Sequence, residues 1–123
     1  MKKAFLLIAG LALALGGTNA SAADAEAGKK VFKKCKACHS LKPGKKKVGP
    51  SLHDVVGNKA GQFKGYKYSK ALKKADITWD YASLDAYLTK PRKFLKGTKM
   101  SFVGLKKKKD RDIVIAYIKA NSK

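Results

Sequence analysis

The chain of 123 residues has few acidic residues and few of the side chains that take part in redox or metal chemistry. It contains 8 Asp and Glu against 29 Lys and Arg, which gives a formal net charge of +21, and only two cysteines, two histidines and two methionines. So small a set limits the number of metal or thiol sites that the chain can build. Its apolar runs are all shorter than the ~20 residues that a membrane-spanning helix needs.

The excess of positive charge restricts the partners of the chain and not its fold. Polycations of this kind bind nucleic acids, anionic membranes or acidic proteins, and composition alone does not choose among these partners. A coat of lysine that only keeps the chain in solution is the simplest alternative.

The N-terminus predicts an export signal over residues 1–23. A basic start, M-K-K, is followed by an apolar run of about a dozen residues and by the small residues A-S-A-A before Asp24. We expect cleavage after Ala23, which leaves one domain, residues 24–123, and we expect this domain to reside in the periplasm. An uncleaved N-terminal anchor is the alternative. An exported protein meets little nucleic acid, so we expect no nucleic-acid partner.

The rest of the sequence predicts helices separated by long loops, without repeats and without a pattern typical of strands. Leu84, Tyr87 and Leu88 recur on one face of one expected helix, and Ile113, Val114, Tyr117 and Ile118 on that of another. We expect helices from Asp24 as N-cap to about residue 38, over 69–74, from Thr78 as N-cap to a stop at Pro91, and over about 109–120. The predicted fold class is all-α.

Both cysteines lie in the stretch K-C-K-A-C-H-S, and a histidine follows the second cysteine directly. Cys-x-x-Cys-His is the attachment signature of c-type haem. The spacing lets Cys35 and Cys38 each form a thioether with one haem vinyl group, while His39 becomes an axial ligand of the iron. The motif therefore predicts one covalently bound haem c.

Three other uses of the cysteine pair fit the sequence less well. A thioredoxin-like redox pair needs a βαβ setting, which a helical pattern lacks. A Cys₂His₂ zinc site needs histidines well beyond the thiols, whereas His39 adjoins Cys38. A disulfide across two residues is strained.

The second axial ligand follows by elimination among few candidates. Met100 is the only methionine after the signal, and it lies in a loop between two glycines, where a core-filling role is less expected than on a helix face. His53 is the competitor, but it follows His39 by only 14 residues. We interpret His53 as a loop residue that does not reach the opposite face of the haem.

Taken together, these residues resemble the class I c-type cytochromes over the whole mature chain, and the bacterial cytochromes c2 more than mitochondrial cytochrome c. The stretches that carry the resemblance are Gly28 and Phe32, C-K-A-C-H, K-V-G-P-S-L, G-Y-K-Y-S, I-T-W, Y-L-x-x-P, G-T-K-M-x-F and I-A-Y-I-K. The resemblance implies a single all-α domain of helices and loops wrapped around one haem. One departure is Asn58, where the mitochondrial type has an arginine near the haem propionates.

The resemblance also implies a role for individual residues. Pro50 would accept the free N–H of His39, and Tyr87 would approach the sulfur of Met100. Gly28 would let the first helix cross the last against Tyr117. Three residues, Tyr68, Trp79 and Thr98, would form hydrogen bonds on the propionate side of the haem. The implied cofactor-binding set is Cys35, Cys38, Pro50, Leu52, Tyr68, Trp79, Tyr87, Thr98 and Phe102, with His39 and Met100 on the iron.

The implied function is electron transport and not catalysis, because an iron with two protein ligands has no vacant site for substrate. We expect a monomer that docks on acidic surfaces of a bc-type complex, an oxidase, a photosynthetic reaction centre or a dehydrogenase, with transient membrane-surface contact left open. A peroxidase-like haem enzyme and a basic binding module are the alternatives. The lysines that would surround the exposed haem edge are Lys33, Lys34, Lys36, Lys46, Lys47, Lys93, Lys96, Lys99 and Lys106.

Overall fold

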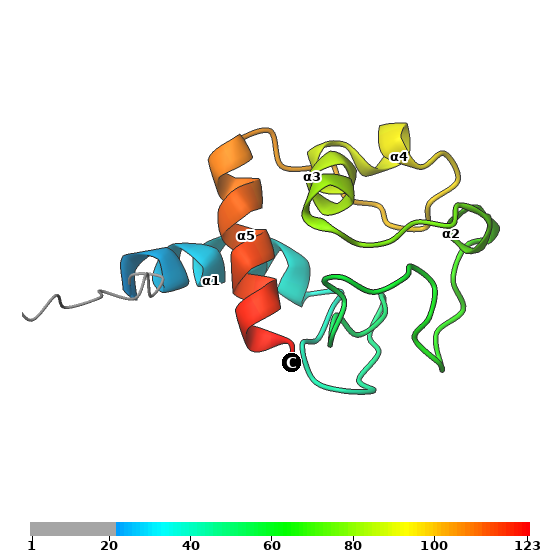
Figure 1. Cartoon of the computed structure of the whole chain (residues 1–123), viewed down its shortest axis with the longest axis horizontal. Helices are drawn as coiled ribbons and strands as arrows, with labels where there is room; N and C mark the ends of the chain where they lie inside the picture. The colour runs from blue at the N-terminus through cyan, green and yellow to red at the C-terminus, as the bar shows by residue number, and fades with distance from the viewer. Residues whose placement is uncertain (1–21) are drawn as a thin grey trace, which may run out of the picture.

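The computed structural model describes residues 22–123, in which five helices are joined by long irregular segments (Figure 1). The only β pairing in this range is an isolated bridge between Lys59 and Thr78, so the all-α prediction is confirmed. None of the described helices is long and apolar enough to cross a membrane. The helices are α1 (Ala22–Lys36), α2 (Lys70–Lys74), α3 (Tyr81–Thr89), α4 (Pro91–Phe94) and α5 (Lys108–Asn121).

The predicted export signal lies outside the described residues, apart from Ala22 and Ala23, which begin α1. The expected N-cap at Asp24 is therefore wrong, because Asp24 lies in the first turn of the helix. An acidic side chain at this position still interacts favourably with the N-terminal end of the helix dipole.

Helices α1 and α5 cross at close range, and this contact fixes the position of α1 (Figure 1). A Cβ atom at Gly28 would lie 2.7 Å from the Cβ of Tyr117 and 3.2 Å from the carbonyl oxygen of Ile113, so only glycine permits this approach. The ring of Phe32 packs on that of Tyr117 with 5.5 Å between centroids. The predicted crossing at Gly28 is confirmed.

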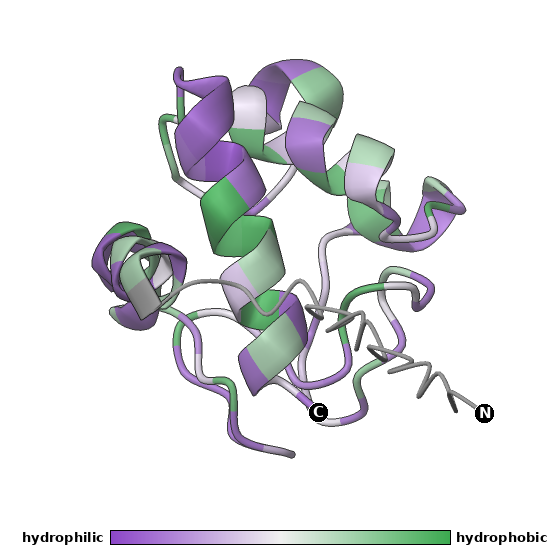
Figure 2. Ribbon diagram, turned by 60° about the vertical axis from the view of Figure 1, so that its left-hand side comes forward, coloured by the Kyte–Doolittle hydropathy of each residue, from purple (hydrophilic) through white to green (hydrophobic). Residues whose placement is uncertain are grey.

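The apolar core is built around α5, whose middle is hydrophobic while its first turn is hydrophilic (Figure 2). Of the residues expected to face inward, Val114 and Ile118 are buried, whereas Ile113 and Tyr117 are half-buried. Ile115, which the sequence analysis left out, is also buried. The buried core consists of Phe32, Trp79, Leu84, Tyr87, Leu88, Leu105, Val114, Ile115 and Ile118.

Helix α3 begins later than predicted, because its N-cap is Asp80 and not Thr78. The Asp80 carboxylate accepts a hydrogen bond of 2.8 Å from the backbone N–H of Ser83, which lowers the pKa of this carboxyl group. A carboxylate at this place also benefits from the helix dipole, which a threonine hydroxyl does not. Pro91 follows the end of α3 as predicted, but it also starts α4, since proline suits the first position of a helix.

Two irregular segments complete the fold. Residues 37–69 connect α1 to α2, and residues 95–107, here called the Met100 segment, connect α4 to α5. Both segments contribute residues to a cavity whose lining is completed by α3, α5, the end of α1, α2 and residues 78–79.

Candidate functional site

A cavity of about 760 Å³ lies between the two long segments and residues of α1, α2, α3 and α5, with residues 78–79 also in its lining. This volume lies in the range of sites that bind cofactors and other small molecules. The predicted site residues that line it are Cys35, His39, Pro50, Leu52, Tyr68, Trp79, Tyr87, Thr98 and Met100. Two predicted residues are not part of its lining. The side chain of Cys38 is exposed, and Phe102 is half-buried against the core cluster.

The end of α1 positions the Cys-x-x-Cys-His motif. Cys35 lies in the last turn of the helix, and its carbonyl oxygen accepts hydrogen bonds from the N–H groups of Cys38, at 3.1 Å, and of His39, at 2.9 Å. This turn places Cys35 and His39 on the same cavity wall. The two cysteines are free thiols and form no disulfide with each other.

The imidazole of His39 is held by the next turn of the chain. Its Nδ1 lies 2.7 Å from the carbonyl oxygen of Pro50. Because a carbonyl oxygen only accepts, Nδ1 must carry the proton, which leaves Nε2 with the lone pair that can bind a metal. Burial lowers the pKa of His39, partly opposed by the hydrogen bond to Pro50, so the neutral form that binds metals is favoured.

Gly49 packs closely against the imidazole ring of His39. A Cβ atom at Gly49 would lie 2.5 Å from Cε1 and 2.9 Å from Nδ1 of His39, so the imidazole rests directly on the glycine backbone. The N–H of Gly49 donates a hydrogen bond of 2.8 Å to the carbonyl oxygen of Cys38. Three contacts therefore join the Gly49-Pro50 turn to the cysteine motif: two hydrogen bonds and one close packing contact.

Cys35 is a protonated thiol at neutral pH. Burial raises its pKa to about 11, with a smaller contribution from the neighbouring Cys38 and an opposing effect of Lys34. A raised pKa makes this thiol a weak nucleophile at neutral pH, because the thiolate is the reactive form. The expected thioether linkage therefore rests on the motif and not on the pKa of Cys35.

Tyr87 and Thr98 connect α3 to the Met100 segment. Their hydroxyl groups lie 2.6 Å apart, and the N–H of Met100 donates to Thr98 Oγ1 at 3.3 Å. Burial raises the pKa of Tyr87, so its hydroxyl stays protonated. The direct partner of the Tyr87 hydroxyl is thus Thr98, through which it reaches the backbone of Met100.

Two further aromatic residues of the predicted set, Tyr68 and Trp79, line the cavity. The ring of Trp79 is buried and packs on Tyr87, with centroids 5.0 Å apart. The hydroxyl of Tyr68 accepts a hydrogen bond of 3.2 Å from the N–H of Phe63, and burial raises the pKa of Tyr68. Both residues line the cavity, as does Leu52.

His53 and Asn58 also reach this cavity. The Nε2 of His53 lies 3.2 Å from a carboxylate oxygen of Asp54, whereas its buried Nδ1 has no hydrogen-bond partner. The Asn58 side chain donates to the carbonyl oxygen of Asp54 and is mostly exposed. His53 is a loop residue, as predicted, but it is closer to the site than the sequence indicated.

The sequence analysis missed several wall residues because they carry no reactive group. Gly49 lay within the K-V-G-P-S-L stretch and could have been singled out, since a residue before proline beside the motif is confined to an extended backbone. Others, including Leu72, Ile115 and Ile118, are apolar helix residues whose position depends on packing alone.

The donor set of the cavity fits a covalently bound haem better than the alternatives. It offers the Cys35 thiol, the Nε2 of His39 and the Met100 thioether, while the Cys38 thiol is exposed outside the lining. Within residues 22–123 there is no cluster of three His, Cys, Asp or Glu side chains that could hold a metal ion, and there is no βαβ unit. The zinc and thioredoxin-like interpretations therefore find no support in this part of the chain.

Comparison with known proteins gives consistent results. The cytochrome c family model matches residues 25–122. The cytochrome c2 of Rhodomicrobium vannielii is 45% identical over 119 residues, covering 96% of this chain and 95% of that protein. The cytochrome c2 of Rhodoblastus acidophilus is 51% identical over 98 residues, covering 79% and 92%. The structure of cytochrome cH from Methylobacterium extorquens superposes with a TM-score of 0.74 at 50% identity, covering 79% of this chain and 98% of that one.

The contact between Gly49 and His39 can be tested by Gly49→Ala. The added methyl group has to displace the imidazole and weaken its bond to Pro50, so we expect the free energy of unfolding to fall by about 1–3 kcal/mol. Denaturant unfolding of the mature protein measures this change. Gly44→Asn is the control, because no atom lies within 4 Å of a Cβ at Gly44, and asparagine tolerates a positive φ. Equal stability of the two variants would show that the ring does not rest on Gly49.

Proposed function

Since the chain belongs to the cytochrome c family, we propose that it carries single electrons in the periplasm through a haem iron held by His39 and Met100. Members of this family carry one covalently attached haem c and are electron carriers, not enzymes. The thioether bonds are assigned to Cys35 and Cys38. The rest of the proposed cofactor-binding set is Pro50, Leu52, Tyr68, Trp79, Tyr87, Thr98 and Phe102.

The observation that carries the proposal is the state of the His39 ring. Its Nδ1 donates to Pro50 at 2.7 Å, so Nε2 is left as the ligating atom of a neutral imidazole on the cavity wall. A hydrogen bond to the second ring nitrogen is a regular feature of metal-binding histidines, because it fixes the tautomer and the ring orientation. Met100 lines the same cavity and supplies the sulfur ligand.

When bound, the haem iron supplies a one-electron couple. The chain's own residues determine how that couple is used. With His39 and Met100 both committed as ligands, no coordination position is left for peroxide or oxygen, which favours electron transfer over the peroxidase alternative. The buried walls of Trp79, Leu84 and Tyr87 give a low dielectric that disfavours additional positive charge, and so favour the reduced state.

The lysines have a role in this function as a docking surface. The ring of lysines proposed around the haem edge is exposed at every position. Positive charge of this density steers an acidic partner toward the site and raises encounter rates by roughly 10- to 1,000-fold at low ionic strength. The proposed partners are acidic surfaces of membrane redox complexes or dehydrogenases, bound through small and short-lived interfaces.

The N-terminal sequence supports the proposed location. A basic start, a short apolar run and the small residues before Asp24 form a signal for export. We propose that residues 1–23 are removed and that residues 24–123 act as a monomer in the periplasm.

Replacement of the sulfur ligand tests the proposed ligation. Met100→Ala should abolish the far-red charge-transfer band between sulfur and ferric iron, lower the reduction potential and allow reaction with peroxide. Absorption spectroscopy and potentiometry of the haem-loaded protein measure these changes. His53→Gln is the control and should keep the band, because we place His53 in a loop and not on the iron. A wild type without the band, whose ferric spectrum changes in His53→Gln but not in Met100→Ala, would reverse the assignment.

The docking role of the lysines can be tested by charge reversal. Lys96→Glu, within the proposed ring, should slow electron transfer to an acidic redox partner by roughly threefold or more at low salt. The difference should shrink as the Debye length falls to ~8 Å at physiological ionic strength. Lys119→Glu on α5 makes the same change of net charge outside the ring and should have a smaller effect. Rates that do not depend on salt or on the position of the reversed charge would exclude steering by the ring.

A further inference from the structure

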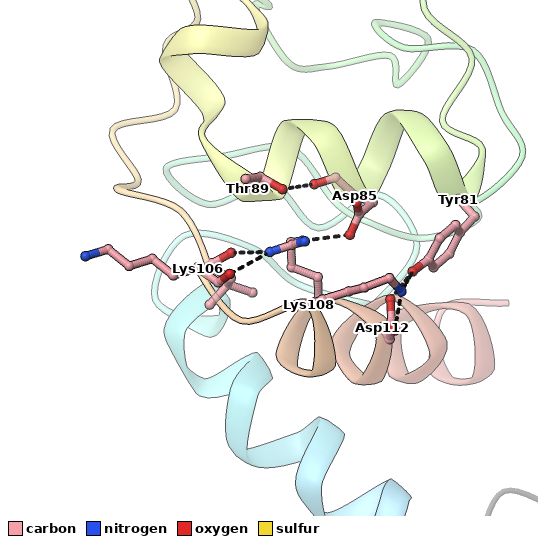
Figure 3. A network of polar contacts seen from close by, with 8 residues as sticks. Tyr81, Asp85, Thr89, Lys106, Lys108 and Asp112 are labelled. Carbon is pink, nitrogen blue, oxygen red and sulfur yellow. Dashed lines mark hydrogen bonds and ion pairs between the residues drawn. The ribbon is translucent and has the colours of Figure 1, made fainter.

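We propose that an ion pair between the half-buried Asp85 on α3 and the buried Arg111 on α5 positions Met100, although neither residue lines the cavity. This inference rests on the proposed role of Met100 as an iron ligand. The four residues concerned, Asp85, Arg111, Leu105 and Lys106, are here called the Arg111 clamp. Figure 3 shows Asp85 and Lys106 within the polar network between α3 and the start of α5.

Hydrogen bonds attach the Met100 segment to the rest of the protein on both sides of Met100, and one of them runs from Lys99 Nζ to the carbonyl oxygen of Lys67 at 2.6 Å. On the near side, Thr98 Oγ1 bonds the Tyr87 hydroxyl at 2.6 Å and accepts from the Met100 N–H at 3.3 Å. On the far side, the N–H of Leu105 donates to the carbonyl oxygen of Leu88 at 2.7 Å. Residues 101–104 make no hydrogen bond with any described residue. The position of Met100 therefore depends on the attachments on both sides.

Arg111 provides most of the far attachment. Its Nη1 donates to the carbonyl oxygens of Leu105 and Lys106, at 2.9 and 3.0 Å, and its Nε donates to Asp85 Oδ1 at 2.7 Å. The residue is only 8% exposed, and Leu105 only 3%. One guanidinium group thus holds two consecutive carbonyl groups of the segment against α3.

The carboxylate of Asp85 holds the Arg111 guanidinium beside the carbonyl groups of Leu105 and Lys106. The charge of arginine cannot be removed by deprotonation, so burial requires a compensating group. The Asp85 side chain is 26% exposed and provides the only carboxylate that pairs with Arg111 among residues 22–123. Without that charge, the guanidinium gains by turning toward water, and in doing so it releases the carbonyl groups of Leu105 and Lys106.

A second ion pair in the same network offers a matched control. Lys108 and Asp112 pair at 2.7 Å, and the Tyr81 hydroxyl donates to Asp112 from α3 (Figure 3). These side chains also join α3 to α5, but they are exposed and bond no group of the Met100 segment. Asp112→Asn therefore removes a similar charge without altering the clamp.

The test measures how easily imidazole replaces Met100 in the ferric, haem-loaded protein. Asp85→Asn should raise the equilibrium affinity for imidazole by about tenfold, the effect of losing one charged hydrogen bond. Asp85→Glu should restore most of the resistance, and Asp112→Asn should stay within about twofold of the wild type. Arg111→Lys should behave like Asp85→Asn, because an ammonium group cannot serve the carboxylate and both carbonyls in the same geometry.

The outcomes separate this inference from the proposed function. If the wild type binds imidazole as readily as Met100→Ala does, Met100 is not the ligand and both proposals are wrong. If the wild type resists imidazole but Asp85→Asn and Asp112→Asn respond equally, only the clamp is wrong. Far-ultraviolet circular dichroism shows that each variant is folded, and denaturant unfolding of Asp85→Asn and Asp112→Asn shows whether the difference in imidazole affinity exceeds the difference in global stability.

Discussion

The hydrogen bond from His39 Nδ1 to the Pro50 carbonyl group is the interaction on which the geometry of the site depends. It fixes the tautomer of the ring, and Gly49 beneath the ring fixes its orientation. Both effects require that the end of α1 lies beside the G-P turn, and the close crossing of α1 and α5 at Gly28 sets the position of α1. The contact between α1 and α5 thus determines the direction of His39 Nε2 in the cavity lining.

The part of the cavity lining that contains Met100 is held in place by a different means. Met100 belongs to a segment without regular structure, and such segments are mobile unless their backbone groups find partners. The partners are the hydroxyl pair of Tyr87 and Thr98 on one side and the Arg111 clamp on the other. Two kinds of charged group have different proposed roles. The surface lysines are proposed to act at long range on partners, whereas the buried Arg111 binds carbonyl groups of the chain itself.

The sequence predicted which reactive side chains gather at one cavity better than it predicted the contacts that hold them there. Cys35, His39 and Met100 could be assigned to one site because the chain has few cysteines, histidines and methionines, and the helical class followed from the spacing of apolar residues. The N-cap of α3 was misassigned because Thr78 and Asp80 both suit that position, and only the hydrogen bond to Ser83 distinguishes them. The pairing of Asp85 with Arg111 could not be predicted, since residues 26 positions apart meet only through the packing of α3 on α5.

Mass spectrometry of the purified, exported protein under denaturing conditions tests most directly whether this chain is built around a covalently attached haem. The expected result is one species with the mass of a chain that begins at Asp24 plus one haem, in which neither Cys35 nor Cys38 reacts with a thiol-alkylating reagent. A species with the mass of the polypeptide alone, with two alkylated cysteines or a disulfide between them, would contradict it.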